Sequence, residues 1–355
     1  MKTKYISMLL LATCFSGQVF AGNEDRVGSA GATELLLNPW SRSLAMGSAN
    51  VATVSGLEGA FINIGGLAML NKMELAAVRT NLYGKDGVKV NSLGFGTKVG
   101  ESSVIALTYT GLNFGDIPVT TVDNPEGLGT TFSPRYTILG LAYARTFSNS
   151  IYGGIQLKIV NESIANAKST GVAFDAGIKY VTGEKDQIKF GINLKNVGPP
   201  MSYSGDGFAV TSTFDAVTPV NDFQSTTEIR SAKFELPSQV NISFGYDFLF
   251  GETGKLTAVG CYTSNSFSKD NYRLGLEYVH TLKKAQFGVR AGYNYEKGIF
   301  KADTRTTAFP GPAAGVSVDF GKDSKAGSLI GIDYTFQPVS YMASTHTVGL
   351  RITLK

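Results

Sequence analysis

Hydrophobic and polar residues alternate along most of the chain from Met73 to the C-terminus, in segments of about ten residues. In the segment 240–248, one face carries Val240, Ile242, Phe244, Tyr246 and Phe248, and the other Asn241, Ser243, Gly245 and Asp247. The pattern predicts about fourteen strands, at 73–83, 88–99, 103–112, 135–147, 151–161, 170–182, 188–197, 239–249, 255–263, 270–279, 285–295, 312–320, 329–337 and 345–354. A soluble sandwich also alternates, so alternation alone leaves the class of protein open.

The lengths of the connections distinguish these classes. With both chain ends placed on the periplasmic side, every connection after an even-numbered strand is short, and the long ones, 113–134, 198–238 and 296–311, follow odd-numbered strands. Outer-membrane barrels have short periplasmic turns and long external loops, whereas a sandwich has no reason to sort its loops in this way. We therefore predict that residues 73–355 form an all-β, transmembrane antiparallel β-barrel of about 14 strands.

Aromatic residues on the apolar face support a membrane barrel. Tyr136, Tyr272, Tyr295 and Phe336 fall at the predicted external strand ends, and Tyr180, Phe248, Tyr278 and Phe320 at the periplasmic ends. Rings gather at both membrane interfaces because one part can stay apolar while the other meets water. The alternative is the general preference of aromatic residues for strands.

Residues 1–21 have the features of a secretory signal peptide. Lys2 and Lys4 precede an apolar stretch, and Val19-Phe20-Ala21 forms an A-x-A-like cleavage site. The alternative is a lipoprotein signal with an acylated Cys14. Beyond residue 21, no apolar run reaches the ~18 residues that a spanning helix needs, so strands are expected to hold the exported chain in the membrane.

The segment 22–72 lacks the strand alternation, and the part from Arg26 to Leu70 is rich in Gly, Ala and Ser. It also contains the single tryptophan, Trp40. We predict that it forms an N-terminal plug in the barrel lumen, in which Asn50 and Asn63 satisfy backbone groups. A disordered periplasmic tail is the alternative, which the apolar content of the segment disfavours.

The predicted inner face of the barrel carries charges of both signs and many glycines. The charged residues are Asp175, Lys179, Lys189, Lys195, Asp247, Arg273, Glu277, Arg290, Asp319, Asp333 and Arg351. The glycines are Gly154, Gly177, Gly191, Gly245, Gly275, Gly288, Gly292, Gly315, Gly331 and Gly349. Mixed signs predict paired charges, and strand glycines indicate close approach of another backbone, for which the plug segment is the candidate.

Composition and motifs argue against several functions. Charged residues make up 17% of the chain and the net charge is +4, too small and too evenly spread for nucleic-acid binding. His280 and His346 lack further ligands at metal-binding spacing. Gly94-Phe95-Gly96 lies within a predicted strand and is followed by no helix, so it is not a phosphate loop. We predict a protein that is not an enzyme and has no cofactor.

The plug contains a recognisable motif. Its residues 41–49, Ser-Arg-Ser-Leu-Ala-Met-Gly-Ser-Ala, resemble the opening segment of the PorV/PorQ family of outer-membrane barrels, which reads A-R-A-x-x-M-G-x-A and is followed by N-P-A-G-L. Here the second element is N-I-G-G-L at 63–67, without the Pro-Ala pair. L-K-N-V-G-P at 194–199 and F-E-L-P at 234–237 also resemble the family. The resemblance marks as site residues Arg42, Met46, Gly47, Asn50, Asn63 and Gly66.

The resemblance implies a FadL-like fold in the outer membrane. It predicts a function in type IX protein secretion or surface attachment, with FadL-like transport of hydrophobic small molecules as the alternative. PorV/PorQ proteins of Bacteroidota act in type IX protein secretion, where they bind the C-terminal signal domains of secreted proteins or accompany the translocon. This implies translocon components and cargo as partners, besides outer-membrane lipid. FadL-type barrels instead transport hydrophobic small molecules, which implies such a molecule in the lumen. An apolar path through the plug would favour the second function.

Overall fold

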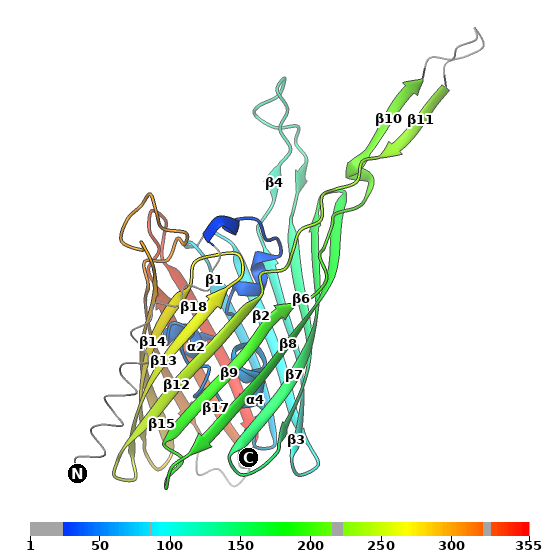
Figure 1. The fold of residues 1–355 in the computed structure, drawn as a ribbon. Helices are drawn as coiled ribbons and strands as arrows, with labels where there is room; N and C mark the ends of the chain where they lie inside the picture. Colours follow the sequence, from blue (N-terminus) through cyan, green and yellow to red (C-terminus); the bar gives the residue numbers. More distant parts are fainter. Residues whose placement is uncertain (1–23, 86, 215–222, 322–327, 355) are drawn as a thin grey trace.

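A computed structural model describes residues 24–85, 87–214, 223–321 and 328–354. Fourteen strands pair antiparallel into a closed barrel in the order β1-β18-β17-β16-β15-β14-β13-β12-β9-β8-β7-β6-β3-β2 (Figure 1). The predicted fold class, an all-β antiparallel barrel of fourteen strands, is therefore confirmed. The predicted signal peptide, residues 1–21, lies outside the described residues. Cys14, on which the lipoprotein alternative depends, lies outside them too.

The strands begin and end close to where the alternation places them. The barrel strands are β1 (Met73–Asn81), β2 (Lys89–Val99), β3 (Ser103–Asn113), β6 (Arg135–Thr146), β7 (Ile151–Ile164), β8 (Ala167–Thr182), β9 (Ile188–Val197), β12 (Gln239–Phe250), β13 (Gly254–Asn265), β14 (Asn271–Thr281), β15 (Ala285–Glu296), β16 (Pro312–Phe320), β17 (Ser328–Gln337) and β18 (Thr345–Leu354). Closure leaves no strand edge in the wall unpaired, which an apolar surrounding requires.

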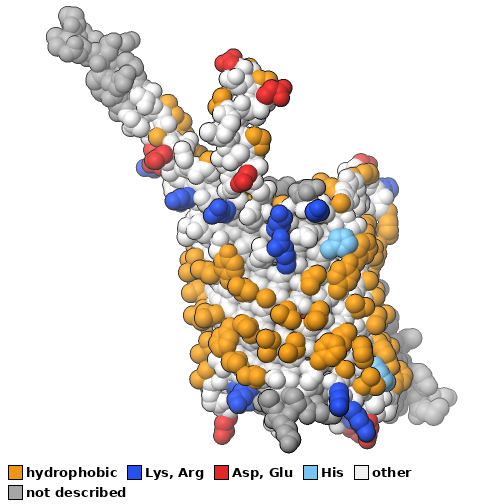
Figure 2. Space-filling model, turned by 180° about the vertical axis from the view of Figure 1, so that it is seen from behind, with side chains coloured by type: hydrophobic (Ala, Val, Ile, Leu, Met, Phe, Trp, Pro, Cys, Tyr) orange, Lys and Arg blue, Asp and Glu red, His pale blue; other side chains and the backbone are white. Residues whose placement is uncertain are grey.

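The outer face of the wall is apolar. Figure 2 shows hydrophobic side chains over the height of the strands, with Lys, Arg, Asp and Glu gathered near the two ends. Leu107 and Leu276, at mid-strand, have more than half of their surface exposed, at 56% and 51%. In water such a surface would be strongly unfavourable, whereas in a bilayer it is the expected one.

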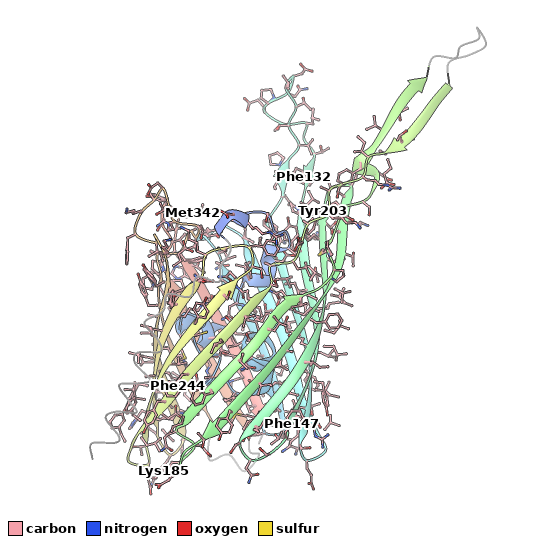
Figure 3. The ribbon with its side chains drawn as sticks, in the orientation of Figure 1. Phe132, Phe147, Lys185, Tyr203, Phe244 and Met342 are labelled. Atoms are coloured by element: carbon pink, nitrogen blue, oxygen red, sulfur yellow. The ribbon has the colours of Figure 1, made fainter. Side chains whose placement is uncertain are left out.

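The two ends of the barrel differ, as the loop lengths predict. Short turns lie at one end, which we call the turn end, and the long connections lie at the other, the loop end (Figure 1). Figure 3 places Lys185 at the turn end and Met342 at the loop end. Two hairpins project from the loop end, one formed by β4 (Ile117–Pro118) and β5 (Thr131–Phe132), the other by β10 (Ala209–Phe214) and β11 (Phe223–Glu228).

Residues 24–72 form short helices and turns that run from the loop-end opening into the lumen of the barrel (Figure 1). The helices are η1 (Glu24–Arg26), η2 (Thr33–Leu36), α2 (Ser41–Ala45), α3 (Gly59–Ile62) and α4 (Ile64–Leu67), and a further short helix, η3 (Asp206–Phe208), precedes β10. The main core lies between this segment and the inner wall, where Trp40, Leu57 and Leu67 pack against Val78 and Val104. We call residues 24–72 the plug segment.

Glycines of the inner wall allow this close packing. A β-carbon on Gly177 would lie 2.2 Å from Oδ1 of Asn63, and one on Gly191 would lie 2.6 Å from the carbonyl oxygen of Val51. Seven of the ten predicted inward glycines approach the plug segment to 3.0 Å or less in this way, and Gly349 meets Ser41 at an ordinary contact distance of 3.5 Å. Gly288 and Gly331 instead approach side chains of neighbouring wall strands, so for these two the expected plug contact is wrong.

One aromatic residue is on the opposite face from its prediction. In β6, Leu139, Leu141 and Tyr143 face outward, so Tyr136 faces the lumen, where it packs edge-on against Phe114. The other predicted belt residues are exposed on the outer wall, namely Tyr272, Tyr295, Phe336, Tyr180, Phe248, Tyr278 and Phe320.

Candidate ligand cavities around the plug segment

A pocket opens into the lumen at the loop end, with a volume of about 140 Å³. We call it the loop-side pocket. Its apolar lining includes Leu36, Leu37, Leu44, Leu82, Val90 and Phe309. Phe309 belongs to the long connection 296–311, which folds back over the lumen and packs against buried Leu82 and Val90. The pocket is therefore formed by the plug segment, the wall and a long loop together.

The polar side of the loop-side pocket contains two buried side-chain atoms without hydrogen-bond partners. Arg273 of β14 and Asn294 of β15 lie opposite each other in the strand register, and both line the pocket. The Arg273 Nε atom and the Asn294 Oδ1 atom are buried and have no hydrogen-bond partner in the structure. Buried polar atoms normally have partners, so these two atoms are candidates for contact with a bound molecule.

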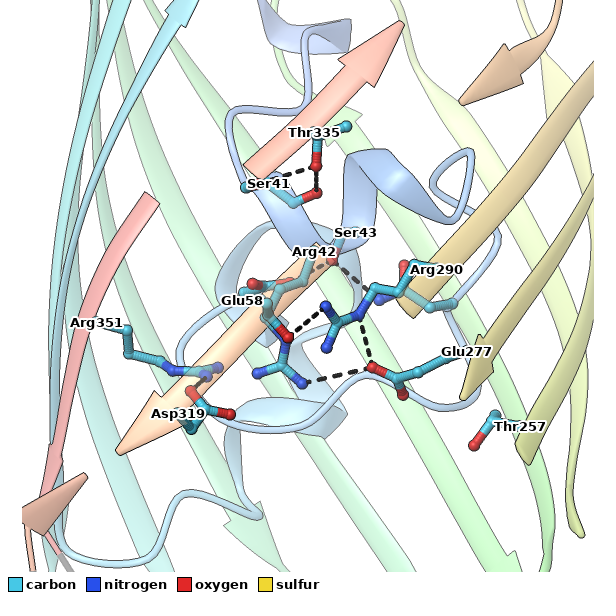
Figure 4. Close-up of polar contacts among 12 residues, drawn as sticks. Ser41, Arg42, Ser43, Glu58, Thr257, Glu277, Arg290, Asp319, Thr335 and Arg351 are labelled. Carbon is cyan, nitrogen blue, oxygen red and sulfur yellow. Dashed lines mark hydrogen bonds and ion pairs between the residues drawn. The ribbon is translucent and has the colours of Figure 1, made fainter. Parts of the chain in front are cut away.

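A second cavity of about 200 Å³ lies on the other side of the 42–50 segment and is mainly polar. We call it the turn-side cavity. Charged residues in its lining are Arg42, Glu58, Lys189, Lys255, Glu277 and Arg290. Figure 4 shows several of them meeting in one network between α2 and the wall.

This network attaches the plug segment to the wall. Arg290 Nε donates to Glu277 Oε1 at 2.7 Å, and Arg42 Nη2 lies 3.8 Å from the same oxygen (Figure 4). The Ser43 hydroxyl donates to Glu58 at 2.5 Å and accepts from Asn50 at 2.9 Å. Burial alone would lower the pKa of Arg42, but the charges of Glu58 and Glu277 outweigh it and raise the pKa above its ordinary value. Arg42 is thus held as a cation among carboxylates.

The sequence-derived site residues fall into two groups. Gly47 lines the loop-side pocket, whereas Arg42, Met46 and Asn50 line the turn-side cavity. The segment 42–50 therefore separates the two cavities. A molecule crossing the lumen between them would have to displace it.

Asn63 and Gly66 lie away from both cavities and have structural contacts. Asn63 Nδ2 donates to the carbonyl oxygens of Val51 and Ile178, and its Oδ1 accepts from the Gly65 backbone. Asn63 thus satisfies backbone groups of both plug segment and wall. A β-carbon on Gly66 would lie 2.5 Å from the Val54 carbonyl oxygen, so only glycine fits there.

The two later sequence motifs meet in space. Asn196, from L-K-N-V-G-P, has a left-handed backbone (φ 59°) at a β-bulge where two residues of β9 oppose Asp175. Its backbone N–H donates to Asp175 at 2.7 Å, and its side chain donates to the carbonyl oxygen of Pro237, the last residue of F-E-L-P, at 3.1 Å. Sequence reasoning identified both motifs but gave no sign that they touch.

The predicted pairing of inner-face charges holds in part. Ion pairs join Lys189 to Asp247, Glu277 to Arg290 and Asp319 to Arg351. Lys179 is different, because it donates to the plug carbonyl of Val54 at 2.6 Å. The Lys195 ammonium lies 3.6 Å from the centre of the Phe61 ring. For these two lysines and for Arg273, the prediction of paired charges is wrong, because the plug segment or a pocket faces them. It is wrong for Asp333 as well, whose Oδ1 is buried without a partner among the described residues.

A buried carboxyl pair was missed by sequence reasoning. Glu34 of η2 and Glu162 of β7 are 3% and 2% exposed, and the Tyr203 hydroxyl donates to Glu162. Figure 3 shows Tyr203 at the loop end, beside the base of the longer hairpin. Burial, and secondly the charge of Glu162, raise the pKa of Glu34 to about 8. The two carboxyls are 128 positions apart in the chain, so no local pattern could indicate the pair.

Within the part of the chain that the structure describes, no group of three or more His, Cys, Asp or Glu side chains is placed to hold a metal ion. No helix among those residues is long and apolar enough to cross a membrane.

Comparison with known proteins gives a fold and no sequence family. No family model and no curated protein matches the sequence. Among solved structures, the Pseudomonas putida toluene transporter TodX matches with a TM-score of 0.56 at 10% identity, over 89% of this chain and 97% of that one. A Pseudomonas aeruginosa FadL homologue matches with 0.53 at 11% identity, over 94% and 99%. The CymD monoaromatic hydrocarbon channel matches with 0.53 at 12% identity, over 93% and 97%.

The chain has a FadL-type barrel fold. At these identities the likeness concerns the fold alone, and it gives no specific support to the PorV/PorQ resemblance. TodX is named as a transporter and CymD as a channel, and neither is named as an enzyme. A FadL-type barrel with an apolar outer wall also supports a location in the outer membrane.

Proposed function

We propose that this protein is an outer-membrane channel for hydrophobic small molecules, with the loop-side pocket as its entry site. The pocket carries the proposal, because it is a partly apolar cavity at the loop end of a FadL-type barrel, directly above the plug segment. In this proposal the loop end faces the exterior, and residues 1–21 are the signal peptide that directs export. Mostly apolar cavities with a few polar groups are the usual form of small-molecule sites.

The turn-side cavity supplies the second step of the proposed path. It is polar and charged, so a hydrophobic molecule would pass it briefly and would not be retained there. Passage requires the segment 42–50 to move, because this segment separates the two cavities. The ion pair of Arg42 with Glu277, a wall carboxylate that Arg290 also binds, holds the segment in its closed position.

The test measures uptake of radiolabelled toluene by Gram-negative cells. The cells express this protein and lack other channels of this type. Thr307 lines the pocket from the 296–311 connection, so Thr307→Trp should fill much of the space and reduce uptake to the level of cells with empty vector. Thr130→Trp, at an exposed position of the β4–β5 hairpin, is the matched control and should leave uptake unchanged. Equal uptake with and without folded protein in the membrane would exclude the channel.

Type IX secretion is a second candidate, because two hairpins project beyond the wall at the loop end and could contact cargo or translocon. Its test is a tagged pull-down from outer membranes in mild detergent, with mass spectrometry. Recovery of a large translocon barrel, or of secreted proteins that share a C-terminal domain, would favour secretion. Recovery of the barrel alone would count against a role in secretion. A variant without residues 117–132, which form the β4–β5 hairpin, is the control, and recovery of the same proteins with this variant would exclude contacts through that hairpin.

A further inference from the structure

We infer that the loop-side pocket binds small organic acids, with the ligand carboxylate held by Arg273. This rests on the proposed function, because it names the class of molecule that the same pocket would select. The starting observation is that Arg273 faces the pocket with a buried Nε that has no partner.

No carboxylate on the inner wall neutralises Arg273 among the residues that the structure describes. Four inner-wall carboxylates are engaged elsewhere, since Glu277 pairs with Arg290, Asp319 with Arg351, Asp175 with Lys158 and Asp247 with Lys189. Asp333 keeps an unpartnered Oδ1, but in the described part of the chain it forms no ion pair with Arg273. Glu296, at the end of β15, accepts from both the backbone N–H and the hydroxyl of Thr306. The position therefore retains a net positive charge.

A guanidinium in this situation favours one kind of partner. Its planar set of N–H donors matches the two oxygens of a carboxylate, and such charge-assisted hydrogen bonds are stronger than neutral ones. Asn294 Oδ1, the second unpartnered atom, lies on the register partner of Arg273 and can accept a hydrogen bond from the ligand. An acid with a hydroxyl beside its carboxylate would satisfy both residues at once.

The remaining lining sets the size of the ligand. The pocket has a volume of about 140 Å³, and Leu82, Val90 and Phe309 form part of its apolar side. An apolar cavity of ~150 Å³ accommodates benzene. The pocket therefore fits an acid with a single ring, such as benzoate or 2-hydroxybenzoate, and is too small to enclose a long acyl chain.

The test is isothermal titration of the purified protein in detergent with benzoate, benzamide and toluene. Benzoate should bind more tightly than its uncharged analogue benzamide, by about ten- to a hundredfold. Arg273→Met should remove that preference, so that benzoate and benzamide bind with about equal affinity. Arg273→Lys should keep part of the preference, because charge remains but the planar fork is lost. The heat-dependent gel shift of folded barrels checks that each variant is folded.

The outcomes separate this inference from the proposed channel. If benzoate binds no better than benzamide, or if Arg273→Met leaves benzoate binding unchanged, the acid-binding role is wrong even where toluene uptake continues. If no probe binds at all, the pocket is not a ligand site and the inference fails with it. If benzoate binding depends on Arg273 but expression of the protein does not raise toluene uptake in cells, the acid-binding site is supported and the proposed channel function is wrong.

Discussion

Gly292 of β15 lies so close to Gly47 of the plug segment that a β-carbon on Gly292 would be 2.1 Å from the Gly47 backbone nitrogen. Gly47 itself has a left-handed backbone, with φ of 62°. The wall and the segment that divides the two cavities thus touch backbone to backbone. Contact of this kind tolerates no side chain on either partner.

Gly292→Ala should therefore displace the plug segment and lower stability by about 1–3 kcal/mol, the usual cost of overpacking. The displacement should also make cells that express the variant more sensitive to large hydrophilic antibiotics, because the lumen is less completely filled. Thermal unfolding followed by the gel shift of the barrel measures the first effect, and growth inhibition measures the second.

Gly260→Ala is the matched control. Gly260 lies on β13, two strands away from β15, and faces outward, where its added β-carbon would meet a leucine side-chain atom at 3.8 Å. We expect this variant to behave as the parent protein. Equal behaviour of the two alanine variants would contradict the backbone contact described above.

Asn63→Ala should be among the more destabilising plug substitutions, by about 2–4 kcal/mol, because it removes the hydrogen bonds to the carbonyl oxygens of Val51 and Ile178 and from the Gly65 N–H. Asn63→Asp keeps the acceptor but loses the donor, so its effect should resemble that of alanine. Urea unfolding of the detergent-solubilised barrel measures both. An aspartate variant as stable as the parent would show that the two donated bonds contribute little.

Leu276→Arg tests the membrane wall. Leu276 lies outward at mid-strand on β14, between Tyr272 and Tyr278, whereas Leu282 lies in the short turn that follows, and the two are similarly exposed at 51% and 47%. An arginine at mid-bilayer costs about 2–4 kcal/mol and near the interface about 0–1. Leu276→Arg should reduce the amount of folded protein in the outer membrane, and Leu282→Arg should not. In a water-soluble barrel the two arginines would have equal effects.

The Glu34–Glu162 pair predicts a pH dependence of stability. Burial first, and the charge of Glu162 second, raise the pKa of Glu34 from 4.5 to about 8, so the folded state favours the neutral carboxyl. Its stabilising contribution is fully present below about pH 4.5 and is lost as the pH rises through about 8. Thermal midpoints between pH 5 and 9 should fall with rising pH.

Glu34→Gln should flatten that profile, because the amide stays neutral at every pH. Glu101→Gln, at an exposed position of a short turn, is the control and should retain the parent profile. The carboxyl pair would have no role in the pH response if both variants followed the parent curve.

Much of the wall could be predicted from the sequence because strand alternation is local. Residues two apart share a face, so the apolar face of β12 is visible in the order of its residues alone. Tyr136 shows the limit of this argument. It lies near a strand end, where a register error of one residue changes the face, and only the neighbouring Leu139 and Leu141 in the structure fix its direction.

The site depended on contacts that no local pattern contains. The resemblance pointed to Arg42, Met46, Gly47 and Asn50, but not to their position between two cavities. Arg273 was expected to have a paired charge, because its strand neighbours carry charges of both signs. Its actual surroundings come from the plug segment, β15 and a distant loop.

The sequence by itself thus determined the strands, the face each presents to the membrane, and the sorting of long and short connections. These follow from a two-residue period and from the transfer of apolar side chains out of water, both of which act along the chain. Tertiary structure alone decided which charges pair, where the cavities lie, and that Arg273 pairs with no carboxylate among the residues that the structure describes. Those features arise when strands distant in sequence close around the plug segment, and pairing between residues more than a hundred positions apart leaves no trace in local order.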